Sequence, residues 1–263
     1  MADGSLWVAV FYRGALLRVD PVAQAVVDEV PVGEGAIGVA AAAGSLWVTL
    51  HLEDSVARVD PATGELLAQV AVGAQPEGIA GDDVAIWATS EEDGELMRID
   101  PATNRVVATV DVGQAPRHVG IGFGSVWVTN YYSGTLMRID PASNAVTATI
   151  KVGSGPEGIA FTEDAVWVAN KGTGDVSRID PATNAEVTRV RTGSGTEGLT
   201  ADAAGRVWVA VSGLDAVAAI DPATNQVSLT LDAGDEPRRL LALDGTLWVT
   251  NTSGGTLSAL PVD

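Results

Sequence analysis

Tryptophan recurs along this chain at an almost constant interval. The seven tryptophans are separated by 40, 40, 40, 40, 41 and 40 residues, and the one extra residue lies in the stretch TADAAGRVW. They stand at positions Trp7, Trp47, Trp87, Trp127, Trp167, Trp208 and Trp248. A fixed period of this length is typical of solenoids and propellers. The repeat therefore constrains the fold more than any other feature of the sequence.

Within one repeat, four short runs have the pattern of β-strands. They are EGIAF at 157–161, AVWVAN at 165–170, DVSRID at 175–180 and AEVTRVRTG at 185–193, with Gly, Asn, Asp or Pro between them. Short alternating runs bounded by turn residues predict strands. Four antiparallel strands repeated about seven times describe propeller blades. We therefore predict an all-β, seven-bladed propeller that forms a single domain over residues 1–263.

A heptad, RIDPATN, occurs unchanged at 98–104 and 178–184, with near copies elsewhere in the chain. Pro101 cannot donate a hydrogen bond to a sheet ladder. The Asp before it and the Thr and Asn after it can bond nearby backbone groups. We expect a structural turn between the third and the outermost strand of each blade. The recurring arginine is expected to pair within or between blades.

Residues 127–170 carry the patterns WVTN, IDPASN and VGSGPEGIAF. They resemble the YVTN-repeat family of bacterial β-propellers, and the tryptophan of LWVTN is similar to the virginiamycin B lyase family of seven-bladed propellers. The first resemblance implies a binding or scaffold role in the cell envelope or outside the cell. The second implies a Mg-dependent enzyme that opens a macrocyclic lactone, with His residues as acid and base and a Glu on the metal.

In these families GIA is the innermost strand of a blade. By that order the chain begins on a second strand, SLWVAV, and ends on a third, TLSAL. We therefore expect 26 strands, with blade one lacking its innermost strand and blade seven its outermost. Unpaired strand edges invite pairing with another chain. The terminal blades are thus a predicted place for self-association.

The charge of the chain limits its partners. With 15 basic and 34 acidic residues, the formal net charge is -19, which disfavours nucleic acids and anionic membrane surfaces. No apolar run is long enough to predict membrane insertion. The opening MADGSLWVAV lacks the pattern of a signal peptide. Cysteine is absent, so thiolate metal sites and disulfides are excluded.

One position at the head of the innermost strand alternates in charge between blades. It is occupied by Ile37, Glu77, Arg117, Glu157, Glu197 and Arg238. Three glutamates could supply oxygen ligands for a hard cation. The intervening arginines favour mutual neutralisation instead. We expect no metal and no cofactor, with Mg only if the chain is a lyase.

The chain has two histidines, His51 and His118. The lyase resemblance implies Pro-His-Gly where this chain has Pro-Glu-Gly or Pro-Arg, so His118 stands one place past the matching position. Two histidines that transfer protons must reach the same substrate, yet these lie in different kinds of loop two blades apart. We therefore predict no catalytic residue.

Aromatic and basic residues gather in the loops expected on one face of the propeller. Such a face suits an interface or a ligand site, so we predict a protein or a small anionic ligand at the mouth of the central channel. The alternative is simple pairing of the arginines with the glutamates. The candidate binding residues are Phe11, Tyr12, Arg13, His51, Glu77, Arg117, His118, Tyr131, Tyr132, Glu157, Glu197, Arg238 and Arg239.

Departures from the repeat consensus cluster in a few loops, and a ligand must be recognised by them because consensus positions are alike in every blade. The loops are 11–14, 50–54, 90–94, 115–119, 130–134 and 236–240. The predicted function is a non-enzymatic binding or scaffold propeller. A Mg-dependent lyase and an amplified or engineered propeller without an evolved ligand are the alternatives.

Overall fold

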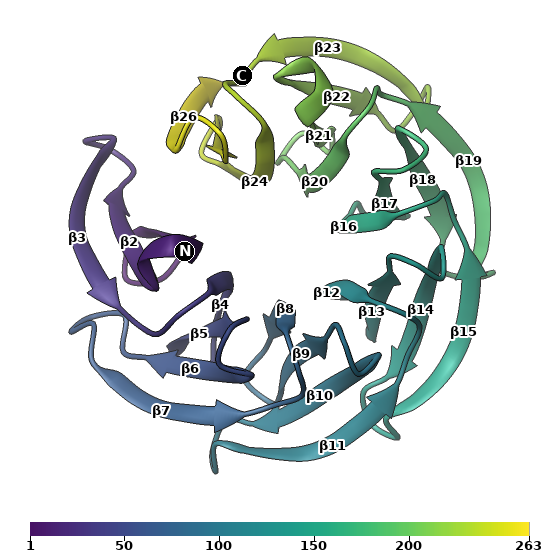
Figure 1. The fold of residues 1–263 in the computed structure, drawn as a ribbon. Coiled ribbons are helices and arrows are strands. Elements are labelled where there is room, and N and C mark those ends of the chain that lie inside the picture. Colours follow the sequence, from purple (N-terminus) through teal and green to yellow (C-terminus); the bar gives the residue numbers. More distant parts are fainter. Residues whose placement is uncertain (263) are drawn as a thin grey trace. The chain divides into compact units, whose positions relative to one another are not determined.

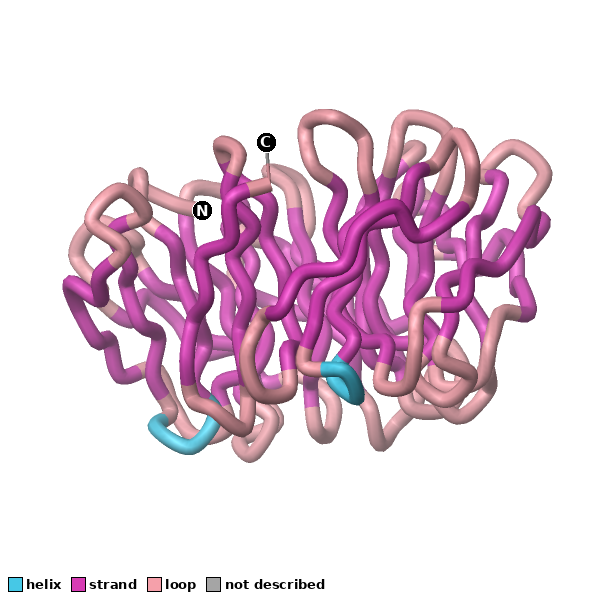
Figure 2. Tube along the Cα trace, turned by 90° about the horizontal axis from the view of Figure 1, so that it is seen from above, coloured by secondary structure: helices cyan, strands magenta, loops and turns pink. Residues whose placement is uncertain are grey.

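The computed structural model describes residues 1–262, which form strands, turns and two short 3-10 helices (Figures 1 and 2). Consecutive strands pair antiparallel in seven separate sheets of three or four strands. The sheets are the blades of a seven-bladed β-propeller, as predicted. The predicted strand 175–180 is β18 (Asp175–Asp180), and the other three predicted runs match β16, β17 and β19 to within two residues at each end.

The chain divides into two compact units. Unit 1 comprises Met1–Val128 and Ile139–Val146, and unit 2 comprises Thr129–Arg138 and Thr147–Asp263. Residues of the fourth sheet belong to both units.

Unit 1 contains the sheets of blades one to three. Blade one also carries the 3-10 helix η1 (Phe11–Arg13) between its first two strands. The strands are β1 (Leu6–Val10), β2 (Ala15–Asp20), β3 (Ala25–Pro31), β4 (Ala36–Ala42), β5 (Ser45–Leu50), β6 (Ser55–Val59), β7 (Leu66–Ala71), β8 (Pro76–Gly81), β9 (Ile86–Ser90), β10 (Glu95–Asp100) and β11 (Arg105–Asp111).

Blade four and the sheets of unit 2 repeat this order. The fourth sheet consists of β12 (Pro116–Gly122), β13 (Ser125–Asn130), β14 (Thr135–Asp140) and β15 (Ala145–Lys151). Blade six carries η2 (Ser212–Leu214). The strands of unit 2 are β16 (Pro156–Phe161), β17 (Val166–Asn170), β18 (Asp175–Asp180), β19 (Ala185–Arg191), β20 (Thr196–Ala201), β21 (Val207–Val211), β22 (Ala216–Asp221), β23 (Gln226–Asp232), β24 (Pro237–Leu243), β25 (Thr246–Asn251) and β26 (Thr256–Pro261).

The terminal blades each have three strands, in the orders β1-β2-β3 and β24-β25-β26. The predicted total of 26 strands is therefore confirmed for the described residues 1–262. Among these residues, no helix is both long and apolar enough to cross a membrane.

The repeated tryptophan fills the space between successive sheets of a unit. Trp47 on β5 packs with Ile79, Ile86 and Ile99 of the next blade, and Trp167 likewise packs with apolar residues of β21 and β22. The indole N–H of Trp47 donates to the carbonyl of Ala42 at 3.2 Å. The apolar ring is thus fully buried while its one polar atom is satisfied.

In blades two to five the heptad arginine links its blade to the turn of the next. Arg58 donates to the carbonyl of Pro101 at 2.7 Å and to Oδ1 of Asn104 at 2.9 Å. The same pair of bonds joins Arg98 to Pro141 and Asn144. Equivalent bonds are made by Arg138 and Arg178. The heptad is therefore scaffolding, and its arginine does pair between blades.

Each heptad turn is closed by its aspartate. The backbone N–H of Ala102 donates to Oδ1 of Asp100 at 2.8 Å, and the hydroxyl of Thr103 donates to Oδ2 at 2.9 Å. These bonds to the ionised form hold the pKa of Asp100 below the usual aspartate value. Asn104 has a positive φ of 55°, which asparagine tolerates better than most residues. The turn chemistry explains why the five letters DPATN recur together.

The innermost strands of neighbouring blades lie side by side: β4, β8 and β12 in unit 1, and β16, β20 and β24 in unit 2 (Figure 1). A Cβ on Gly78 would lie 2.6 Å from the carbonyl oxygen of Arg117, so only glycine fits there. The hydroxyl of Thr49 accepts from the N–H of Gly38 and donates to the carbonyl of Glu77 at 2.8 Å. The close approach of the Gly78 backbone to Arg117 and the hydrogen bonds of Thr49 set the spacing between neighbouring innermost strands.

Trp127→Ala should lower the free energy of unfolding by about 3–5 kcal/mol, because it removes a fully buried indole and leaves a cavity. Urea unfolding followed by far-UV circular dichroism measures the change. Val22→Ala, at a side chain that is 93% exposed, is the control and should change stability by less than about 0.5 kcal/mol. Equal effects of the two variants would show that the tryptophan is not part of the core.

Arg98→Ala and Asn144→Ala should be coupled, because the guanidinium and the amide oxygen form a bond between blades. We expect an interaction energy of about 1 kcal/mol in a double-mutant cycle of urea unfolding. Arg105→Ala, an exposed arginine on the neighbouring strand β11, should leave the effect of Asn144→Ala unchanged. Strict additivity of Arg98→Ala and Asn144→Ala would contradict the bond.

Candidate functional site

The residues at the heads of the innermost strands sit in β-bulges. The register of β8 with β9 shifts between Pro76 and Ile79. Equivalent shifts occur in β4, β16, β20 and β24. Bulges redirect side chains and are common beside functional sites. The position that alternates between Glu and Arg in the sequence is thus also a structurally special position.

In unit 1 the bulge residue Glu77 is bound by an arginine of the next blade. Nη1 of Arg117 lies 2.5 Å from Oε2 of Glu77, and Nη2 lies 2.9 Å from Oε1 of Glu91. The Glu77 side chain is only 1% exposed. A carboxylate removed from water requires such a partner. Glu77 and Arg117 therefore form a buried ion pair between blades.

In unit 2 the equivalent Glu197 is bound by two cations. Nζ of Lys171 lies 2.8 Å from its Oε1, and Nε of Arg238 lies 3.4 Å from its Oε2. The three side chains together carry one net positive charge. Arg117 and Arg238 thus form ion pairs with glutamates, which is the alternative to ligand binding that the sequence left open.

The described residues form no group of three or more His, Cys, Asp or Glu side chains suited to a metal ion. Glu77 and Glu197 are also neutralised by arginine and lysine. A Mg²⁺ site needs several carboxylate or carbonyl oxygens directed at one point. Two of the three glutamates of the predicted ring therefore do not fit the metal that the lyase resemblance implies.

The loops of blades one and two bring Phe11, Tyr12 and His51 together in unit 1. The ring of Phe11 lies 5.3 Å from that of Tyr12 and 5.9 Å from that of His51. The backbone N–H of His51 donates to the carbonyl of Gly35 at 3.0 Å, whereas its buried Nδ1 has no hydrogen-bond partner among the described residues. His51 therefore packs against an aromatic ring rather than pairing with His118.

A cleft of about 450 Å³ opens beside this aromatic group. Tyr12 is 97% exposed and Leu52 is 60% exposed. We name this depression the blade-one cleft; its lining is Phe11, Tyr12, Arg13, Gly14, Pro31, Gly33, Glu34, Gly35, Leu52 and Glu53. Arg13 is paired at 3.0 Å with Glu29, and both side chains are well exposed.

The remaining predicted residues lie at several places. Tyr131 and Tyr132 contact each other edge to face at 5.3 Å in the loop after β13. Glu157 is buried on β16, and its carbonyl accepts from Thr129 at 2.7 Å. His118 on β12 and Arg239 on β24 stand where blades two, three, five and six have glycine.

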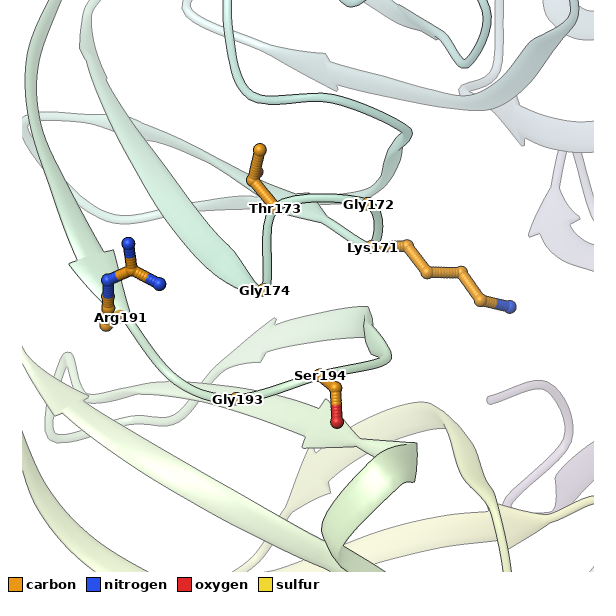
Figure 3. Close-up of a pocket in the computed structure, with 7 residues that line it drawn as sticks. All are labelled: Lys171, Gly172, Thr173, Gly174, Arg191, Gly193 and Ser194. Atoms are coloured by element: carbon orange, nitrogen blue, oxygen red, sulfur yellow. The ribbon is translucent and has the colours of Figure 1, made fainter.

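A second cleft, in blade five of unit 2, was not among the sequence predictions (Figure 3). It has a volume of about 280 Å³, and we name it the blade-five cleft. The residues that line it are Lys171, Gly172, Thr173, Gly174, Arg191, Gly193 and Ser194. The motif KGTG looks like an ordinary polar turn, which is why it was missed. The sequence did contain one indication of this cleft, because Lys171 is one of only two lysines in the whole chain.

Comparison with known proteins identifies the family. The profile described as the virginiamycin B lyase family matches residues 1–260. This chain belongs to that family. No curated protein matches the sequence. The lyase resemblance predicted from the sequence is thereby confirmed, whereas that to YVTN repeats stays a prediction.

Solved structures similar to this family member span more than one function. Kuenenia stuttgartiensis hydrazine synthase has a TM-score of 0.87 at 17% identity, covering 98% of this chain and 92% of its own. A catalytically inactive virginiamycin B lyase from Staphylococcus aureus with quinupristin has a TM-score of 0.87 at 16% identity, covering 100% and 93%. A streptogramin B lyase has 0.85 at 16%, covering 100% and 91%. At these identities the likeness shows the fold alone.

Arg117→Ala should lower the free energy of unfolding by roughly 3–5 kcal/mol, because it leaves the buried carboxylate of Glu77 without its main partner. Urea unfolding at neutral pH measures the loss. Arg13→Ala removes an exposed ion pair and should cost no more than about 1 kcal/mol. If Arg117→Ala is as mild as Arg13→Ala, Arg117 is not an internal structural cation.

Proposed function

We propose that this member of the virginiamycin B lyase family is a non-enzymatic binding propeller. Its loop face recognises a partner through clefts that differ from blade to blade. The observation that carries the proposal is that two clefts at equivalent places in the repeat have different linings. The blade-one cleft has Phe11 and Tyr12 where the blade-five cleft has Lys171 and Gly172.

The difference between the two linings distinguishes residues that hold the fold together from residues that could recognise a partner. Buried tryptophans and heptad turns recur in nearly every blade, whereas the cleft residues vary while their backbone position is kept. An exposed aromatic such as Tyr12 offers a large contact area with little entropy to lose on binding. A binding function uses such a surface directly, and the proposal extends to a partner in the bacterial cell envelope, as the sequence resemblance implies.

The family match favours a second candidate, a Mg-dependent lyase acting on a cyclic peptide such as quinupristin. Against it stand the ion pairs of Glu77 and Glu197, which leave these carboxylates committed to arginine and lysine. The only two histidines of the chain also belong to different blades. We therefore favour binding over turnover.

Incubation with quinupristin, with and without Mg²⁺, tests the choice between the two candidates. Mass spectrometry of the ligand should show no opening of the lactone in either condition. Mg²⁺-dependent ring opening that disappears in His118→Ala would overturn the non-enzymatic proposal.

Photocrosslinking tests the binding face itself. A photoreactive amino acid is placed at Tyr12, which is 97% exposed, or at Val22, which is 93% exposed and lies in a heptad turn. In a bacterial cell-envelope extract, only the Tyr12 position should give a discrete adduct. Identical adduct patterns from both positions would count against a specific surface at the blade-one cleft.

A further inference from the structure

The loop that leads from the outermost strand of one blade to the innermost strand of the next binds carboxylates through its backbone. The N–H of Glu34 donates to Oε1 of Glu53 at 2.5 Å. One blade later, at equal spacing from the tryptophans, the N–H of Ala74 donates to Oδ2 of Asp93 at 2.7 Å. The fold thus offers a backbone donor to a carboxylate at this place.

The next residue of the loop repeats the pattern. The N–H of Gln75 donates to Oδ1 of Asp54 at 2.9 Å, and the N–H of Glu236 donates to Oδ1 of Asp215 at 3.0 Å. Two successive backbone N–H groups therefore serve as carboxylate donors in this loop. Successive N–H groups in turns commonly form concave anion sites. We name the pair of donors the carboxylate seat.

In blade five the carboxylate seat has lost both of its internal acids. Ser194 and Gly195 supply the two donors, by their spacing from Trp167. Leu214 stands in the position of Glu53, and Gly174 stands in the position of Asp54. Among the described residues, neither N–H donates a hydrogen bond. The Leu214 side chain lies beside Gly193, as that of Glu53 lies beside Gly33, but it carries no acceptor atom, so the two N–H groups have no carboxylate partner among residues 1–262.

The side chains beside this seat are positive or hydroxylic. Arg191 makes no ion pair among the described residues, and Figure 3 shows its guanidinium directed toward the loop at Gly174. The hydroxyl of Ser194 also makes no hydrogen bond within this part of the chain, and it lies on the far side of Gly193 from Arg191 (Figure 3).

Nearby acids do not cancel this charge. Asp175 lies opposite Arg191 in the strand register and offsets one positive charge; its carboxylate accepts from Asn170 at 2.8 Å and from Thr173 at 3.0 Å. Glu197 is outnumbered by Lys171 and Arg238. With Lys171, Arg191 and Arg238 against Asp175 and Glu197, these five side chains carry one net positive charge, in a chain whose formal net charge is -19.

We propose that the blade-five cleft binds the carboxylate group of an external ligand, such as a small organic acid or an acidic residue of a peptide. The N–H groups of Ser194 and Gly195 take the place they have in other blades, as donors to a carboxylate. Arg191 adds a charge-assisted hydrogen bond. The inference rests on the proposed function, because it assigns a ligand class to one cleft of the binding face.

Titration of the ¹⁵N-labelled protein with acetate at constant ionic strength, followed by NMR, tests the site. The amide signals of Ser194 and Gly195 should shift in a saturable way. Arg191→Gln should weaken the apparent affinity about tenfold, as expected for loss of a charge-assisted bond. Lys151→Gln is the matched control, because Lys151 is the exposed cation at the equivalent position of blade four, and it should leave the acetate affinity unchanged.

A gain-of-function variant gives a second readout. Leu214→Glu restores the acid that Glu53 supplies to blade one, so it should fill the seat from within, abolish the acetate response and raise the melting temperature. An unchanged acetate response in this variant would overturn the assignment of the seat.

Three further outcomes would overturn the inference. They are no saturable shift of the two amides, equal effects of Arg191→Gln and Lys151→Gln, and tighter binding of inorganic phosphate than of acetate. Failure of this site and failure of the proposed function are distinguishable. A retained Tyr12 adduct without an acetate response removes the carboxylate site alone, whereas an acetate response without a Tyr12 adduct removes the partner at the blade-one cleft alone.

Discussion

The burial of an indole between a sheet and its successor within a unit is the contact on which the other features of this protein depend. A three- or four-stranded antiparallel sheet cannot bury both of its faces alone, so each blade needs a neighbour. Trp47 supplies that contact between blades two and three, and Trp167 supplies it between blades five and six. Because a large side chain fills the gap at these junctions, the spacing of the tryptophans varies by no more than one residue.

The polar contacts between blades lie around this apolar packing and are directional. The heptad arginine covers the indole of its own blade, with the guanidinium of Arg58 4.9 Å from the ring of Trp47, and then bonds the turn of the next blade. Blade six shows what the contact requires, because Ala219 replaces that arginine. There Arg206 lies 5.4 Å from the ring of Trp208 and bonds Asp202. A cation from the loop before β21 thus takes the place of the heptad arginine over the indole.

The packing that stabilises the fold lies in the interior of the blades. The loops that lead into the β-bulges of the innermost strands can therefore differ in sequence from blade to blade. Backbone donors there are kept in place by the sheet whatever the side chains are. Where the next blade supplies an acid, the donors are satisfied internally, as at Glu34 and Ala74. Where Leu214 of the next blade and Gly174 of the same blade stand in place of the acids, the two donors have no internal carboxylate, and we propose that a ligand supplies it. Function in such a fold can change by substitution at single loop positions without any change in the blades.

The sequence by itself determined the all-β propeller, the four strands of each blade, the short terminal blades and the structural role of the heptad, because these follow from local periodicity and turn chemistry. It also singled out Glu77, Arg117, Glu197 and Arg238 by their alternating charge. The sequence did not show whether these residues bind a ligand or form ion pairs with one another. The cation that reaches Glu77 depends on the bulge in β8 and on the spacing of β8 and β12. Only the tertiary structure disclosed the blade-five cleft, because its donors are backbone N–H groups that carry no signature in the residue letters, and the two positions that lack an acid lie in different blades.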